Sequence, residues 1–319
     1  MQNTQTQQKR MDFSAVFSKH GALIAFIILF VFNSIFTNNF FRMQTVWNLL
    51  TQSCTTVLLS LGMTVVIATA GIDISVGSAM ALASMVAAKF IMNGEIFIGV
   101  ALGLLSVLFF GYITGTIVIK FDIQSMIVSL SMMFILRGIA KLLNDGRILS
   151  YRNKAFTNFF YLELFDVIPI RLVIWLSMAI FLWLLMSKTR YGVYIEAYGD
   201  NPHTTRISGI GVVSVITSAY MICALFAGVA GIIEAGYSTT VDPANIGLTK
   251  EMDAIAATVV GGTSISGGKP RIWGTVFGAL VLQLITIMVN MNNIPVPWAR
   301  IIKAAIIIVA IYLQKTKKH

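Results

Sequence analysis

Long apolar runs separated by short polar or charged stretches dominate the chain. Their approximate bounds are 21–37, 47–70, 72–92, 96–119, 124–143, 171–187, 210–235, 252–262, 272–290 and 298–313. An α-helix needs about 20 apolar residues to cross a bilayer, and the run at 252–262 supplies only half of that. A short helix at membrane depth must be covered by protein or line a water-filled cavity, so this run points to a pathway. We therefore predict an all-α protein with about ten transmembrane segments, including broken or half-spanning helices.

Two of the breaks between runs have similar sequences. Gly71–Gly77 reads GIDISVG and Gly262–Gly268 reads GTSISGG, which are identical at four of seven positions. Each break follows one apolar run and precedes another, as duplicated broken helices around one path would. A chance match is the alternative, and the predicted topology places both copies in the same orientation.

Composition agrees with a membrane protein. Hydrophobic residues make up 57% of the chain and charged residues 11%, and the mean hydropathy is +0.82, outside the range of soluble domains. The formal net charge is +10, but the basic residues lie mostly between apolar runs rather than in an aromatic-interleaved patch. Anionic lipid is thus a better expected partner than nucleic acid. Both tails are basic, which predicts that both termini are cytoplasmic.

The predicted organisation is a single transmembrane domain over residues 21–314, with cytoplasmic tails at 1–20 and 315–319. A long cytoplasmic loop occupies 188–209. It turns at Gly199–Pro202, which predicts a short surface helix followed by a capped second helix. The outer connection at 144–170 is long enough to form an amphipathic cap on the external face.

The run GTSISGGKP resembles the phosphate-binding loop GxxxxGK[ST]. Thr263 stands at the first glycine position and Pro270 at the Ser/Thr position, and no parallel strand precedes them, so we predict no nucleotide site. Energy must come from an ion gradient or another chain. The sequence has no HExxH or GxSxG motif, and Cys54 and Cys223 are far apart with no histidine pair nearby. We expect neither an enzyme nor a metal site, and no cofactor in this chain.

Neutral hydrogen-bonding side chains on or beside the apolar runs are the candidates for a translocation path. Amides and hydroxyls suit a neutral polyol such as a sugar, although the same residue types also join helices within membranes. Together with one carboxylate, Asp73, the candidates are Gln52, Thr55, Ser75, Ser264 and Gln283. For Asp73 three roles are open: capping the next helix near Ser75 and Val76, contacting substrate, and proton coupling. Glu251 and Asp253 open the eighth run, where carboxylates favour a helix N-terminus.

Five longer stretches carry a family resemblance that covers nearly the whole chain. They are GMTVVIATAGIDISVGS (62–78), IQSMIVSLSMMFILRGIA (123–140), RYGVYIEAYGDNPHTTRISGI (190–210), AGVAGIIEA (227–235) and EMDAIAATVVGGTSISGGKPRIWGTVFGAL (251–280). Together they resemble the permease subunit of bacterial ATP-binding-cassette (ABC) importers for sugars of the ribose, galactose and xylose type.

The resemblance implies a multi-pass permease in the inner membrane, paired with an identical or sister permease. Its further partners would be two cytoplasmic ATPase subunits, which bind ATP and magnesium, and a periplasmic sugar-binding protein. The substrate would be a ribose-like pentose or a hexose. A nucleoside or autoinducer-type sugar is an alternative, as is a stand-alone secondary sugar carrier.

By the same resemblance, the loop at 188–209 looks like the coupling helix that sits in a cleft of the ATPase. The implied coupling residues are Glu196, Gly199, Asn201, Arg206 and Gly209. Arg206→Ala or Gly199→Trp is expected to remove ATPase association and leave the protein folded. The chain departs from the family pattern at Pro270 and at Thr204–Thr205, which leaves the exact substrate open.

Overall fold

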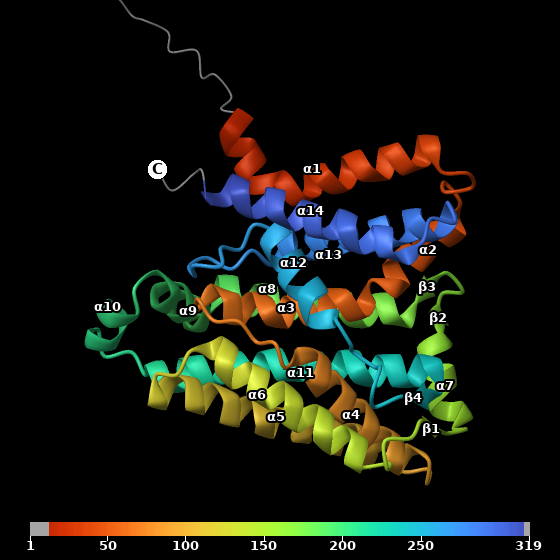
Figure 1. The fold of residues 1–319 in the computed structure, drawn as a ribbon, viewed down its shortest axis with the longest axis horizontal. Helices are drawn as coiled ribbons and strands as arrows, with labels where there is room; N and C mark the ends of the chain where they lie inside the picture. Colours follow the sequence, from red (N-terminus) through yellow and green to blue (C-terminus); the bar gives the residue numbers. More distant parts are fainter. Residues whose placement is uncertain (1–12, 316–319) are drawn as a thin grey trace, which may run out of the picture.

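The helices follow the apolar runs and lie side by side in one bundle (Figure 1). The computed structural model describes residues 13–315, so residues 1–12 and 316–319 of the predicted tails lie outside the described part. The longer helices are α1 (Phe13–Phe36), α2 (Met43–Gln52), α3 (Cys54–Ala68), α4 (Val76–Ile91), α5 (Ile96–Phe121), α6 (Ser125–Leu142), α8 (Ile170–Lys188), α11 (Val212–Ser238), α12 (Lys250–Val260), α13 (Ile272–Met291) and α14 (Val296–Lys315). Helix α1 thus begins within the predicted tail.

Three short helices and four short strands complete the described chain. The helices are α7 (Lys154–Tyr161), α9 (Arg190–Asp200) and α10 (Pro202–Ile207). Strand β1 (Leu149–Ser150) pairs antiparallel with β4 (Thr240–Val241), and β2 (Glu163–Leu164) pairs antiparallel with β3 (Ile168–Pro169). The predicted outer cap therefore contains α7, whose Phe156 and Phe160 are buried, and two strand pairs.

Five of the described helices are long and apolar enough to cross a membrane: α5, α6, α8, α11 and α13. Helices α2 and α3 form a sixth candidate if they are counted as one span, with a bend of 42° at Ser53. Gly21–Phe36 and Val76–Ile91 are shorter apolar helices. The chain is thus a mostly helical protein with five or six apolar spans by length and composition.

Helices α3 and α11 form the centre of the bundle. Every residue of α3 from Cys54 to Ala68 is buried, which fits a helix that is apolar on all sides. Helix α11 packs on α3, α4 and α5. Hydroxyl groups add polar contacts between the central helices: Thr64 and Thr275 oxygens lie 2.8 Å apart, and Thr258 Oγ1 donates to the Ser60 carbonyl at 3.1 Å. Such contacts join helices where no water is available.

Two short helices, α4 and α12, start near each other and run in opposite directions. The backbones of Gly77 in α4 and Gly247 just before α12 touch. Helix α4 then leads to the end of the bundle that holds α7, where Asn153 Nδ2 donates to the Ile91 carbonyl at 3.1 Å. Helix α12 leads toward the end that holds α9 and α10, called here the α9–α10 end (Figure 1). The two short helices therefore share a junction at their N-termini.

Of the two similar breaks in the sequence, only GIDISVG reaches this junction, through Gly77. GIDISVG lies between α3 and α4 and enters the first turn of α4, and GTSISGG lies between α12 and α13. The segment before α12 that faces the start of α4 is 242–249, which has a different sequence. The prediction that the two breaks are duplicated copies stays a prediction. A seven-residue match is too short to identify a structural repeat.

Candidate functional site

The junction between α4 and α12 is the most constrained part of the bundle. A methyl group added to Gly77 would meet the Gly247 carbonyl and would lie 2.6 Å from Oε2 of Glu251. The Glu251 carboxylate, in the first turn of α12, therefore lies against the first turn of α4. Both helices direct the positive ends of their dipoles toward this point, which favours a carboxylate there. Because Gly77 has no side chain, the first turn of α4 can approach the start of α12 closely, and the Glu251 carboxylate lies at the same contact.

Arg137 of α6 secures the segment that leads into α12. Its Nη1 donates to the carbonyls of Pro243 and Ile246, at 3.1 and 2.6 Å. These carbonyls belong to an irregular segment, and a guanidinium group can satisfy several such acceptors at once. In the same segment, Asp242 Oδ1 accepts from the backbone N–H of Ala244 at 2.9 Å. The segment is therefore held both by α6 and by its own turn.

Asp73 lies in the segment between α3 and α4, and its side chain is buried. Its Oδ1 accepts two hydrogen bonds, from the backbone N–H of Ser75 at 2.9 Å and from the Ser75 hydroxyl at 2.6 Å. Helix α6 holds the same segment, since Ile72 N–H donates to Ser125 Oγ at 3.1 Å. Asp73 and Ser75 are thus paired with each other, in the geometry of a turn that leads into a helix.

Two further pairs of polar residues meet near the bend between α2 and α3. Gln283 Nε2 of α13 donates to Oε1 of Gln52 at 3.2 Å, which brings two predicted path residues together. Thr55 Oγ1 donates to Oε2 of Glu234, on α11, at 3.0 Å. The Gln52 side chain is exposed, whereas Thr55 is buried. Gln52 and Gln283 are therefore the predicted path residues whose amides lie nearest to each other and remain accessible.

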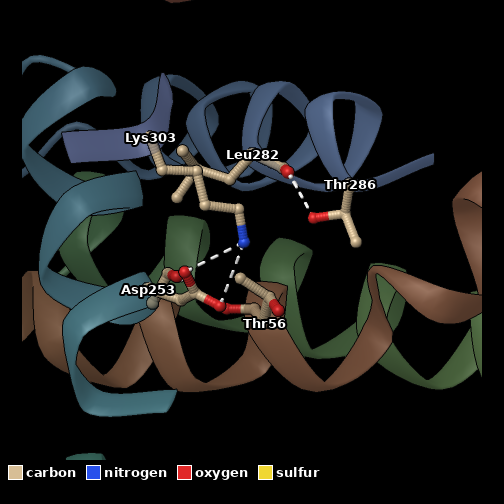
Figure 2. A network of polar contacts seen from close by, with 6 residues as sticks. Thr56, Asp253, Leu282, Thr286 and Lys303 are labelled. Atoms are coloured by element: carbon tan, nitrogen blue, oxygen red, sulfur yellow. Dashed lines mark hydrogen bonds and ion pairs between the residues drawn. The ribbon is translucent and has the colours of Figure 1, made fainter. Parts of the chain in front are cut away.

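An ion pair joins α12 to α14. Lys303 Nζ lies 3.1 Å from Oδ1 and 3.4 Å from Oδ2 of Asp253, and both side chains are largely buried (Figure 2). Thr56 of α3 lies beside the pair in the same view. Charged groups are costly within an apolar bundle unless they are paired, so this contact fixes where α14 sits against α12.

The predicted coupling loop has the predicted form. Helix α9 ends at Asp200, and Asn201 caps α10 by accepting the Thr204 N–H at 3.0 Å. Gly209 follows α10 with a φ of +76°, a conformation that glycine adopts without strain. Glu196 is half-buried on α9, and Arg206 is exposed on α10. Burial raises the pKa of the Tyr198 phenol, and the charge of the neighbouring Arg206 acts in the opposite direction.

The turn that contains Ser264 packs against this loop and against the C-terminus of α3. Gly268 N–H donates to the Ala68 carbonyl at 2.9 Å, and a methyl group on Gly199 would overlap both. Gly199 is buried, so the close approach of three backbones requires glycine there. The hydroxyl of Ser264 accepts the Ser266 N–H at 3.2 Å within the turn. Ser264 therefore lies at the α9–α10 end, apart from Gln52 and Thr55.

Sequence reasoning did not single out Glu234, Arg137 or Lys303 as residues with a partner in another helix or segment. A signal was present for Glu234, because it is a carboxylate near the end of the apolar run at 210–235. An ionisable residue within an apolar helix is costly and is expected to have a partner. For Asp253, the position in the first turn of α12 suggested only an interaction with the helix dipole, whereas the structure adds Lys303.

Comparison with known proteins identifies the family. Residues 45–311 match the family described as branched-chain amino acid transport system / permease component. The chain belongs to this permease family. The permease is 36% identical to the ribose import permease protein of Escherichia coli K12 over 99% of both chains. It is 32% identical to the ribose import permease protein of Bacillus subtilis over 98% of both chains.

A third relative is named for a different sugar. The permease is 30% identical to the D-allose transport system permease protein of Escherichia coli K12, over 97% of this chain and 95% of the relative. No solved structure matches the permease. The family resemblance found in the five sequence stretches is thus confirmed over nearly the full length.

Proposed function

We propose that the permease is the membrane-spanning subunit of an ATP-driven importer for a monosaccharide, a ribose-like pentose or a hexose. The observation that carries this proposal is the match over almost the whole chain to import permeases named for ribose. A relative named for D-allose supports the broader class of monosaccharides. A periplasmic binding protein would deliver the sugar, and the chain itself would catalyse no reaction.

Ten membrane segments, all in the inner membrane, are part of the proposal. Each of the ten apolar runs coincides with a helix or, for α2 and α3, with a bent pair. Among these, α4 and α12 would be half-spans that meet at Gly77 and Gly247. The described part of α1 begins, and that of α14 ends, on the side that holds α9 and α10 (Figure 1). This arrangement supports two termini on one side, which the basic tails assign to the cytoplasm.

ATPase subunits that bind ATP and magnesium would supply the energy. Within residues 13–315, no group of three or more His, Cys, Asp or Glu side chains could hold a metal ion. The turn at Gly262–Gly268 is occupied by its packing on Ala68 and Gly199, so it offers no open phosphate loop. The ATPase would contact α9 and α10 through Glu196, Gly199, Asn201, Arg206 and Gly209. A second permease subunit would complete the transport path.

The sugar path would use the accessible amides of Gln52 and Gln283, with Thr55, Asp73, Ser75 and Ser264 as further candidates. Amides donate and accept hydrogen bonds, as a sugar hydroxyl requires when it leaves water. The Gln52–Gln283 hydrogen bond supports these two most directly, because it is a neutral pair that a sugar hydroxyl could replace. Asp73 and Ser75 already satisfy each other, which supports a structural role for both.

Reconstitution tests the proposed function. Proteoliposomes would contain the permease alone, or the permease with its ATPase, and would be given labelled ribose with the binding protein. Accumulation of ribose that requires ATP, the ATPase and the binding protein is the expected result. Uptake by the permease alone along a sugar or ion gradient would instead establish a stand-alone carrier. Competition by unlabelled xylose, galactose, allose or a nucleoside would then define the substrate.

A further inference from the structure

A groove of about 800 Å³ lies between α5 and α11 and ends beside α10. Its lining extends along α5 from Tyr112 to Lys120, eight residues or about 12 Å of helix. Met221 of α11 lies in the part away from α10, and Gly211 lines the part next to α10. Thr116 and Thr217 face each other between these parts, with their hydroxyl oxygens 3.5 Å apart. The groove is therefore long, open and mostly apolar, and it runs along the spanning helices.

The charge of the groove is confined to the end beside α10. Lys120 lies in the last turn of α5, and Arg206 lies in the last turn of α10. A nearby carboxylate, Asp122, is 92% exposed, and its Oδ1 is 3.9 Å from Arg206 Nη2. An ion pair this long and this exposed contributes little, so the guanidinium, which also contacts the Tyr198 phenol, can bind another anion. One end of the groove is thus cationic, and the rest is mostly apolar, with the hydroxyl groups of Thr116, Ser214, Thr217 and Ser218 as its polar lining.

We propose that this groove binds an anionic phospholipid, with the phosphate of its headgroup at Lys120 and Arg206 and an acyl chain along α5 and α11. A lipid matches the charge pattern, because it has one anionic end and a long apolar chain. Basic pockets between spanning helices on the cytoplasmic side bind such headgroups. This placement rests on the proposed function, which assigns the α9–α10 end to the cytoplasm.

A second copy of the permease is a poorer occupant of the same groove. A symmetric contact brings the same surface of both copies together. Lys120 and Arg206 of one copy would then face the same cations of the other, which is unfavourable. The lipid, by contrast, would neutralise both cations and hold α10 against α5. Lipid occupancy would therefore position the helix that is proposed to contact the ATPase.

Native mass spectrometry of the full chain, purified in detergent, tests the site. The permease would be titrated with phosphatidylglycerol and with phosphatidylcholine of the same acyl chains. We expect preferential binding of phosphatidylglycerol, which falls about tenfold in the Lys120→Gln/Arg206→Gln variant. The matched control is Lys188→Gln/Arg190→Gln, which removes two exposed charges from the same end of the bundle. It should retain the binding of the unmodified chain.

Three results would overturn the proposal. Equal loss in the control would show diffuse attraction to a basic surface, and equal binding of both lipids would show an apolar groove without headgroup recognition. Inorganic phosphate that displaces phosphatidylglycerol fully would show an anion site without an acyl chain. The single variant Lys120→Gln distinguishes a loss of lipid binding in the groove from a change in the coupling helix α10. Lys120 lies on α5, so its substitution leaves α10 unchanged. The lipid-binding measurement needs neither sugar nor ATPase. A negative result would therefore overturn the lipid site alone, and the transport function would still be decided by the proteoliposome assay.

Discussion

Lys303 of α14 and Asp253 of α12 form an ion pair with an Nζ–Oδ1 distance of 3.1 Å. The side chains are 18% and 25% exposed, respectively, so water screens the pair only partly. Helix α12 is half-length, and it packs on α3, α13 and α14. The pair thus joins the last helix of the bundle to a helix whose N-terminus lies at the junction with α4.

Removing one charge of the Asp253–Lys303 pair should destabilise the permease more than removing both charges. Asp253→Asn leaves the Lys303 ammonium without its counter-charge, at a cost of roughly 2 kcal/mol, less than for a fully buried pair. Asp253→Asn/Lys303→Met removes both charges and should recover part of that loss. Thermal unfolding in detergent would be measured for the unmodified permease, Asp253→Asn, Lys303→Met and the double variant. Lys141→Gln, at an exposed lysine in the last turn of α6, is the control. Simple additivity of the two single substitutions would contradict a coupled pair.

Gly77→Ala should disrupt the junction between α4 and α12. The new methyl group would meet the Gly247 carbonyl and the Glu251 carboxylate, so one of the half-helices must move. Overpacking of this kind costs about 1–3 kcal/mol, and we expect ATP-driven uptake to fall by at least tenfold. Sugar uptake in proteoliposomes and thermal unfolding would both be measured.

Gly138→Ala is the matched control for the junction. Gly138 lies within α6, and an added methyl group would have no neighbour within 4 Å. Because alanine is the better helix former, this variant should be at least as stable as the unmodified permease. If Gly77→Ala transported sugar as well as Gly138→Ala does, the close contact at the junction would not matter for transport.

Local patterns in the sequence predicted most of the helices. Runs of apolar residues fix where a helix can be buried, and the short run at 252–262 correctly indicated the half-length α12. The turn at Gly199–Pro202 predicted the two helices of the loop at 188–209, since Asn201 caps α10. These features depend on neighbours in the chain, which a single sequence displays directly.

The contacts at the candidate site could not be predicted in the same way. Thr55 and Glu234 are 179 positions apart, and Arg137 bonds to carbonyls more than 100 positions away. Such contacts depend on how helices pack, and periodicity within one helix carries no information about its partner. The similarity of GIDISVG and GTSISGG gave no information about which segments meet at the junction. The segments that actually meet, at Gly77 and Gly247, share only glycine.

Asp73 substitutions would separate the three roles left open by the sequence. Asp73→Asn keeps an oxygen that can accept from the Ser75 N–H and hydroxyl, so a structural role predicts a folded permease with near-normal uptake. Asp73→Ala removes the acceptor and leaves buried donors unpaired, at a cost of about 1–3 kcal/mol. Uptake and thermal unfolding would be compared for both variants. Loss of uptake in a fully stable Asp73→Asn protein would favour proton coupling or a charge-dependent substrate contact.

Two substitutions in the loop at 188–209 should have different consequences. Arg206→Ala changes an exposed side chain, so the permease should fold normally and bind its ATPase at least tenfold more weakly. Gly199→Trp was expected from the sequence to act in the same way. The structure indicates otherwise, because any side chain there would overlap the Ala68 carbonyl and the Gly268 amide. We therefore expect Gly199→Trp to lower the midpoint of thermal unfolding as well as ATPase binding.

Co-purification of the ATPase and thermal unfolding of the isolated permease would be measured for both variants. His203→Ala is the control, because His203 is exposed on the same short helix and is not among the proposed coupling residues. The Lys120→Gln variant adds a second comparison, since it removes a neighbouring charge without changing α10. If Arg206→Ala and Lys120→Gln weakened ATPase binding equally, the effect of Arg206 would arise from the charge of the groove. A selective loss in Arg206→Ala would support direct contact between α10 and the ATPase.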